Sequence, residues 1–124
     1  MNLLIPKIEH ITDPKHVKFA HQLGCVICGA PEVHFHHLRR AKSRRGQYRS
    51  GDNDGLPLCP RHHNYGEGSL HDSEKLGITE PEYFEMHGIN DPYGLARDIH
   101  ANTGDYEACT QLIQQARTDP RRAL

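Results

Sequence analysis

Long apolar stretches are missing from this chain of 124 residues. No run approaches the roughly 20 apolar residues that cross a bilayer. The first eleven residues are interrupted by Pro6, Lys7 and Glu9, which argues against a signal peptide. Tryptophan is absent and aromatic residues make up only 6% of the chain, so a bound metal would help a core with few large side chains. We therefore expect one soluble, cytoplasmic domain over residues 1–124, with no membrane partner.

A charge excess of either sign is also missing, because 15 Lys and Arg stand against 16 Asp and Glu, for a formal net charge of -1. This balance neither supports nor excludes a nucleic-acid partner. Histidine is abundant instead, with eleven residues beside four cysteines. Since cytoplasmic thiols stay reduced, clustered cysteines predict metal ligands rather than disulfides.

Two short ligand pairs carry the clearest metal signal. Cys25-x-x-Cys28 and Cys59-x-x-His62 supply three thiolates and one imidazole, a ligand set that tetrahedral zinc accepts. The alternative is a set of buried thiols and a surface histidine, but three of the four cysteines fall within these two motifs. We expect a structural zinc ion there and interpret Cys109 as a core residue.

Local signals predict an α+β fold around these motifs. Residues 33–38 alternate as a strand does, and residues 56–58 form a short extended segment. Capping residues followed by apolar periodicity predict helices that begin at Pro14, Pro60, Glu80, Pro92 and Tyr106. In the last of these helices, which we expect to end before Asp119-Pro120, one face is predicted to carry Tyr106, Cys109, Ile113 and Ala116.

Several histidines remain once the zinc site is complete, and these predict a second metal site. They are His36, His37, His63 and His71. Neighbouring residues of a strand point to opposite faces, so one of His36 and His37 can bind the ion while the other serves as a general base. Without the flanking cysteines, surface or metal-free packing would be the preferred interpretation of such a pair.

The order of these motifs resembles the HNH endonuclease superfamily, with its ββα-metal fold, in a version braced by zinc. The match runs from Cys25 to His71 through His36-His37-Leu38 and Leu56-Pro-Leu-Cys59-Pro-Arg-His62-His63. Together with Gly68-Ser-Leu-His71 and Tyr83-Phe84-Glu85-x-His87-Gly88, it is similar to small phage and prophage nucleases associated with recombination. The resemblance implies a core over about 25–71, an N-terminal helix before it, and C-terminal helices over about 79–118.

Roles follow from this resemblance by position. It implies that His36 and His63 bind the catalytic ion, expected to be Mg²⁺ or Mn²⁺, and that His37 deprotonates the attacking water. Asp54 stands at the place of the family's central Asn, which ties the two strands together and orients the base; Asp52 or Asn53 takes this role if the register differs. The last ligand is either His71, which fits the phage subgroup, or Glu67, at the usual spacing from His63.

A basic segment follows the predicted base directly, and it can hold the phosphate backbone of DNA beside the metal. Its residues are Arg39, Arg40, Lys42, Arg44, Arg45 and Arg49. The alternative is a solubilising run of charge. The later acidic residues, expected to lie away from the DNA, are Asp72, Glu74, Glu80, Glu82 and Glu85.

The other histidines receive simpler interpretations. His34 lies on the same strand face as His36, where it can support the metal ligands or touch phosphate. Surface or packing roles are expected for His10, His16, His21, His87 and His100.

As a whole, the sequence predicts a metal-dependent DNA endonuclease acting in phage DNA recombination, with a recombinase as a conceivable partner. The alternatives are a zinc-stabilised DNA-binding module without catalysis and, disfavoured by the arginines, a metal-storage protein.

Overall fold

The computed structural model describes residues 11–38 and 51–117, and within these ranges the protein is a small α+β fold. A two-stranded antiparallel sheet is accompanied by six α-helices and one 3-10 turn. In chain order the elements are α1 (Pro14–Ala20), β1 (His34–His37), η1 (Asp52–Asp54), β2 (Gly55–Leu58), α2 (Pro60–His63), α3 (Leu70–Lys75), α4 (Glu80–Met86), α5 (Pro92–Ala101) and α6 (Tyr106–Arg117). The predicted basic segment lies outside the described residues.

The sheet sets the direction of the two neighbouring histidines. In its register His36 pairs with Leu56 and His37 pairs with Gly55. His36 is 5% exposed, whereas the side chain of His37 is 44% exposed, so the two rings lie on opposite faces as the strand period requires. The N–H of Leu38 donates to the carbonyl of Asp54, which extends the pairing beyond the strand ends.

The helices begin where the capping residues predict. Asp13, Thr79 and Asp91 each accept a backbone N–H of the following helix, and a proline opens each first turn. Thr79 and Glu82 complete a reciprocal capping box at the start of α4. These local hydrogen bonds satisfy N–H groups that a helix leaves unpaired, which explains why short sequence signals located the starts correctly.

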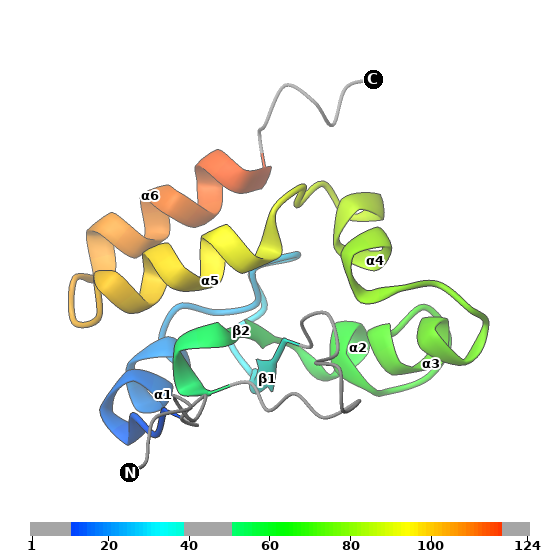
Figure 1. Ribbon diagram of the computed structural model, residues 1–124, viewed down its shortest axis with the longest axis horizontal. Coiled ribbons are helices and arrows are strands. Elements are labelled where there is room, and N and C mark those ends of the chain that lie inside the picture. Colours follow the sequence, from blue (N-terminus) through cyan, green and yellow to red (C-terminus); the bar gives the residue numbers. More distant parts are fainter. Residues whose placement is uncertain (1–10, 39–50, 118–124) are drawn as a thin grey trace, which may run out of the picture.

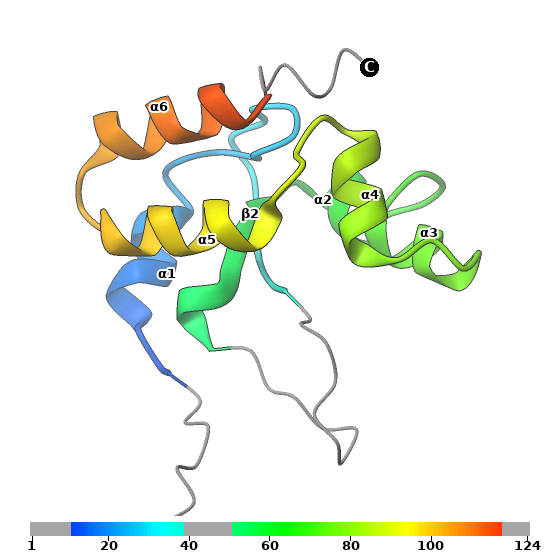
Figure 2. The same cartoon turned by 45° about the horizontal axis from the view of Figure 1, so that its top comes forward.

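The sheet lies between two groups of helices (Figures 1 and 2). On one side α5 and α6 pack against each other, with α1 close to η1, and on the other side lie α2, α3 and α4. A single cluster of buried hydrophobic side chains joins the two groups, with Leu56 and Leu58 from β2, Phe84 from α4, and Ile99 from α5. Cys109 belongs to this cluster and is fully buried, as the sequence predicts.

Two features of the helices go beyond what the sequence predicts. Tyr106 is 54% exposed, although Cys109 and Ile113 on the same face are buried. Helical side chains lean toward the N-terminus, so the side chain of the first residue of α6 leans past the end of the helix into solvent. The second feature is α3, for which no helix was predicted; its signal is Ser69, whose hydroxyl accepts the N–H of Asp72. Among the helices described, none is long and apolar enough to cross a membrane.

Candidate metal centres

The thiolate cluster, formed by Cys25, Cys28, Cys59 and His62, brings together the two predicted ligand pairs. Their ligand atoms all lie within 4.8 Å of one another, so the group can hold a metal ion. Cys25 and Cys28 stand in a turn closed by the N–H of Gly29 donating to the Cys25 carbonyl. Cys59 precedes α2 and His62 lies in its first turn, so a short helix delivers the other pair.

Distances within the thiolate cluster agree with a tetrahedral ion. Two sulfur ligands at about 2.3 Å from zinc lie about 3.8 Å apart, and a sulfur and a nitrogen ligand about 3.6 Å apart. The Cys28 and Cys59 sulfurs are 3.6 Å apart. The Nδ1 atom of His62 lies 3.2 Å from the Cys59 sulfur and 3.8 Å from the Cys25 sulfur. The protein itself therefore holds these atoms close to the edges of a zinc tetrahedron.

Crowding of the sulfurs also changes their acidity. Desolvation, with Cys59 and Cys25 as further causes, raises the pKa of Cys28 to about 11. Burial opposes ionisation of Cys59, but hydrogen bonds from the His62 backbone and the neighbouring thiols lower its pKa overall. Three thiolates so close together need a cation to compensate their charge, so metal binding here must release protons.

The imidazole cluster, formed by His36, His63 and His71, is a second group whose ligand atoms lie within 4.8 Å of one another. It draws one residue each from β1, α2 and α3. The Nε2 atoms of His63 and His71 are 3.3 Å apart, a long distance for a hydrogen bond. Two nitrogen ligands at about 2.0–2.1 Å from a tetrahedral ion lie about 3.3–3.4 Å apart, so the distance between these two atoms agrees with two ligands of one ion.

Each imidazole of this cluster has a partner on its other side. His36 Nε2 lies 2.7 Å from Oε2 of Glu80, and His71 Nδ1 lies 3.1 Å from Oε1 of Glu74. His63 Nδ1 lies 3.0 Å from Nδ1 of His34. Histidines that bind metals are typically held in this way by a hydrogen bond from the nitrogen that does not face the ion. The pattern supports a metal site more strongly than three clustered rings alone.

Within the imidazole cluster, His63 keeps its lone pair available at neutral pH. Burial, followed by the nearby His36, His71 and His34 rings, lowers the pKa of His63 to about 4. Imidazole nitrogens suit zinc, nickel, copper and iron, whereas Mg²⁺ prefers oxygen ligands. Of the two expected ions, the donor set therefore favours Mn²⁺ over Mg²⁺, and zinc or Co²⁺ fits it better still.

Of the two candidates for the last ligand, the structure brings His71 to the cluster. Glu67 is exposed in the turn between α2 and α3 and is not part of the group. The turn is built around Gly66 and Gly68, which both have positive φ angles. The side chain of Tyr83 also fixes this region, because its hydroxyl lies 2.8 Å from the Gly68 carbonyl and 3.2 Å from the His62 carbonyl.

His37 has a carboxylate partner, and it is Asp52 rather than Asp54. His37 Nε2 lies 2.8 Å from Oδ1 of Asp52. Asp54, predicted to stand at the family's central position, is 4% exposed and its Oδ1 lies 4.0 Å from Nε of Arg97. Two different residues therefore make the contacts expected of the family's central Asn. The Asp54 carbonyl accepts the N–H of Leu38 and so links the two strands, and the Asp52 side chain contacts His37.

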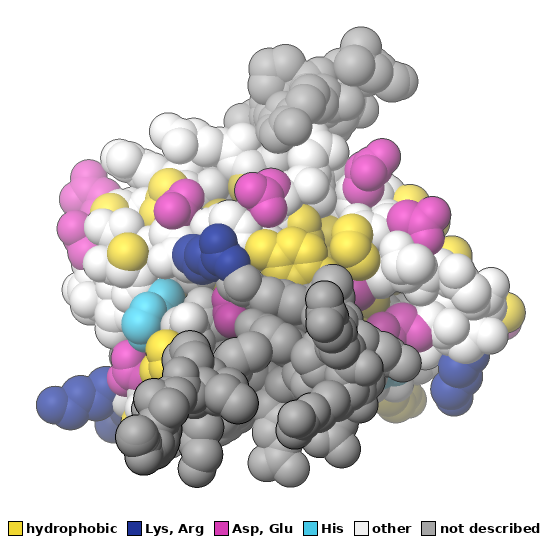
Figure 3. Space-filling view, in the orientation of Figure 1, with side chains coloured by type: hydrophobic (Ala, Val, Ile, Leu, Met, Phe, Trp, Pro, Cys, Tyr) yellow, Lys and Arg dark blue, Asp and Glu magenta, His cyan; other side chains and the backbone are white. Residues whose placement is uncertain are grey.

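Glu74 and Glu80, two of the acidic residues expected to lie away from the DNA, lie beside the imidazole cluster. Both carboxylates contact imidazoles of the cluster. Glu80 had no sequence signal besides its place at the start of a capped helix, because 44 residues separate it from His36. Figure 3 shows acidic side chains along the part of this face where α4, α5 and α6 lie.

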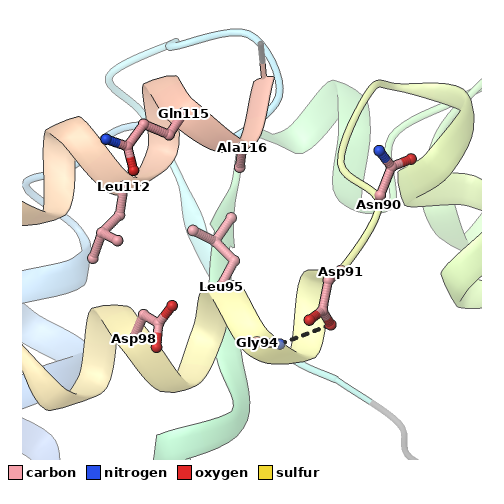
Figure 4. Close-up of a pocket in the computed structure, with 8 residues that line it drawn as sticks. All are labelled: Asn90, Asp91, Gly94, Leu95, Asp98, Leu112, Gln115 and Ala116. Carbon is pink, nitrogen blue, oxygen red and sulfur yellow. Dashed lines mark hydrogen bonds between the residues drawn. The ribbon is translucent and has the colours of Figure 1, made fainter. Parts of the chain in front are cut away.

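An open cavity between α5 and α6 shares no residue with either cluster. It has a volume of about 240 Å³ and is lined by Asp91, Asp98, Leu95 and Leu112, among others (Figure 4). Asp91 caps α5 by accepting the N–H of Gly94 at 2.9 Å, so this carboxylate is explained by helix capping. None of the described residues that line the cavity carries a thiol or an imidazole, so it is not the candidate site.

Comparison with protein-family models, curated proteins and solved structures gave no match for this chain. The motifs and the geometry of the two clusters therefore remain the guide to function.

Proposed function

We propose that this chain is a metal-dependent DNA endonuclease of the HNH type, which hydrolyses phosphodiester bonds and has a ββα-metal core. The observation that carries the proposal is the imidazole cluster, in which three rings from β1, α2 and α3 converge while their outer nitrogens are held by Glu80, His34 and Glu74. His37, which follows His36 in the chain and contacts Asp52, supplies a candidate base.

The thiolate cluster is assigned a structural zinc ion. Its four ligands complete a tetrahedron, which leaves no position for a substrate. Cys25 and Cys59 are buried within the hydrophobic core, so the ion would join the loop before β1 to the start of α2. This assignment explains how a chain with few aromatic residues stabilises its centre.

The imidazole cluster is assigned the catalytic cation. Three protein ligands leave a coordination position open. When bound there, a divalent cation supplies electrostatic stabilisation for charge on the phosphoryl oxygens and on the leaving oxygen. His36, His63 and His71 hold and orient this ion.

His37 is assigned the role of general base. Its side chain is 44% exposed and can reach solvent, and Asp52 accepts a hydrogen bond from its Nε2–H group. The other nitrogen, Nδ1, then carries the lone pair that accepts a proton from the attacking water. Asp52 keeps the ring in this tautomer and orientation.

DNA is the proposed substrate because of the basic segment that follows β1, from Arg39 to Arg49. Guanidinium groups bind phosphates through paired hydrogen bonds, and such contacts position a backbone without selecting a sequence. The resemblance to phage nucleases extends the proposal to DNA recombination, with a recombinase as a candidate partner.

Nicking of a supercoiled plasmid tests the proposal. The purified protein with Mn²⁺, Mg²⁺, Zn²⁺ or Co²⁺ is expected to nick the DNA, and His37→Ala is expected to lower the rate by about 10²–10⁴-fold. His21→Ala is the matched control, because His21 is an exposed histidine at the end of α1. Circular dichroism should show the same fold for all three proteins. Salt-dependent DNA binding without nicking would instead identify a zinc-stabilised DNA-binding module.

A further inference from the structure

Glu80 is a buried carboxylate that lies outside the motif from Cys25 to His71. It is the first residue of α4 and only 4% exposed. A buried carboxylate is costly unless it is paired. Its Oε2 atom lies 2.7 Å from Nε2 of His36, whose side chain is equally buried. The contact joins two elements that are 44 residues apart in the sequence.

Glu80 lies outside the group of ligand atoms that converge in the imidazole cluster. A neutral imidazole that donates from Nε2 to a carboxylate keeps its lone pair on Nδ1. The hydrogen bond therefore selects one tautomer of His36 and fixes the plane of its ring. Outer partners of this kind orient a ligating histidine and increase its electron donation to the metal.

The position of Glu80 is itself fixed by α4. The capping box of Thr79 and Glu82 defines where the helix begins. One turn further on, the Tyr83 hydroxyl lies within hydrogen-bond distance of the carbonyls of His62 and Gly68. The helix is thus anchored both to the thiolate cluster and to the turn that leads to His71.

We infer that Glu80 is a positioning residue for the cation of the imidazole cluster, and that it acts through His36. The inference rests on the metal site of the proposed function, but not on the cleavage of DNA. According to this inference α4, which lies outside the motif from Cys25 to His71, also helps to orient a metal ligand.

Titration with Co²⁺ tests the inference in the full chain with zinc retained in the thiolate cluster. Binding is followed by visible absorption and by calorimetry. Glu80→Gln removes the charge with little change of shape, and it is expected to weaken Co²⁺ binding by about 10- to 100-fold. Glu85→Gln, an exposed glutamate of the same helix, is the matched control and should bind as the wild type does.

A double-mutant cycle separates positioning from a general effect on the fold. In a His36→Ala background, Glu80→Gln is expected to change the remaining Co²⁺ affinity by less than twofold, because the residue through which it acts is gone. Nitrogen-15 NMR of the wild type without Co²⁺ should also show the His36 tautomer protonated on Nε2.

Three outcomes would overturn the inference. Equal Co²⁺ affinity of wild type and Glu80→Gln would do so while leaving the proposed metal site intact. An equal loss in the presence and absence of His36 would show a structural effect. Failure of the wild type itself to bind Co²⁺ at the imidazole cluster would overturn both the inference and the proposed function.

Discussion

Asp52 forms hydrogen bonds with three other residues, in β1 and in the segment before α1. Its Oδ1 atom contacts His37, and its Oδ2 atom accepts the N–H of Asp13 at the start of α1. Its own N–H donates to the carbonyl of Ile11. The orientation of the proposed base therefore depends on the N-terminal helix as well as on the sheet.

This division of roles predicts different effects for two neighbouring aspartates. Asp52→Asn should lower the nicking rate with little change of melting temperature. The loss should not exceed the factor of about 10²–10⁴ that general-base catalysis provides. Asp54→Asn should act mainly on stability, because Asp54 is buried near Arg97. Nicking rates and thermal melts of both variants, with exposed Asp98→Asn as the control, check this. A larger catalytic loss in Asp54→Asn would contradict it.

His16 makes the folded state sensitive to acid. It is fully buried; its Nδ1 lies 2.7 Å from the Thr103 hydroxyl, and its Nε2 has no hydrogen-bond partner among the residues that the structure describes. Burial, with the nearby His100 as a second cause, lowers its pKa below the usual 6.5. Below pH 6.5 the unfolded chain binds a proton that the folded protein resists.

The free energy of unfolding is therefore expected to decrease as the pH falls from 6.5 toward the lowered pKa of His16. One such group contributes a slope of at most about 1.4 kcal/mol per pH unit. His16→Asn keeps a donor for Thr103 and removes the titration, so its stability should depend less steeply on pH. Urea unfolding of both proteins between pH 5 and pH 7 measures the difference, and parallel curves would contradict the prediction.

At the scale of elements, the end of α6 holds the loop of the thiolate cluster. Arg117 donates from Nε to the Val26 carbonyl at 2.7 Å and from Nη2 to the Cys25 carbonyl at 2.8 Å. Arg117→Ala leaves the carbonyl of the buried Val26 without this donor, and hydrogen bonds of charged groups are worth about 1.5–3 kcal/mol each. A clearly lower melting temperature is expected, whereas exposed Lys75→Ala should melt like the wild type.

The elements also show what sequence alone can and cannot predict here. Helix starts depend on a cap and the three residues after it, so Asp13, Thr79 and Asp91 were sufficient. The thiolate cluster was predictable because its ligands come in close pairs. Glu80 and Arg117 were not, since each acts across a large separation, 44 and 91 residues, through packing that no local pattern encodes.

At the scale of the whole molecule, the thiolate cluster joins two distant segments of the chain, since its Cys28 and Cys59 are 31 residues apart in the sequence. Removing one ligand should therefore unfold the protein rather than loosen a loop. Cys59→Ser is expected to lose its bound zinc and its cooperative thermal transition. Cys109→Ser, a buried cysteine outside the cluster, should keep both. Metal analysis and calorimetry distinguish the two, and equal melts for wild type and Cys59→Ser would exclude the structural role of zinc.

His62 and His63 are consecutive residues that belong to different clusters. Successive residues of an α-helix point about 100° apart and rise about 1.5 Å, so one peptide bond fixes the offset between the two centres. An insertion or deletion of a single residue within α2 would turn one ring away from its ion whatever amino acid were added or lost. Variation in chain length is therefore expected only in the connections outside this helix, and neither centre can be moved along the chain without moving the other.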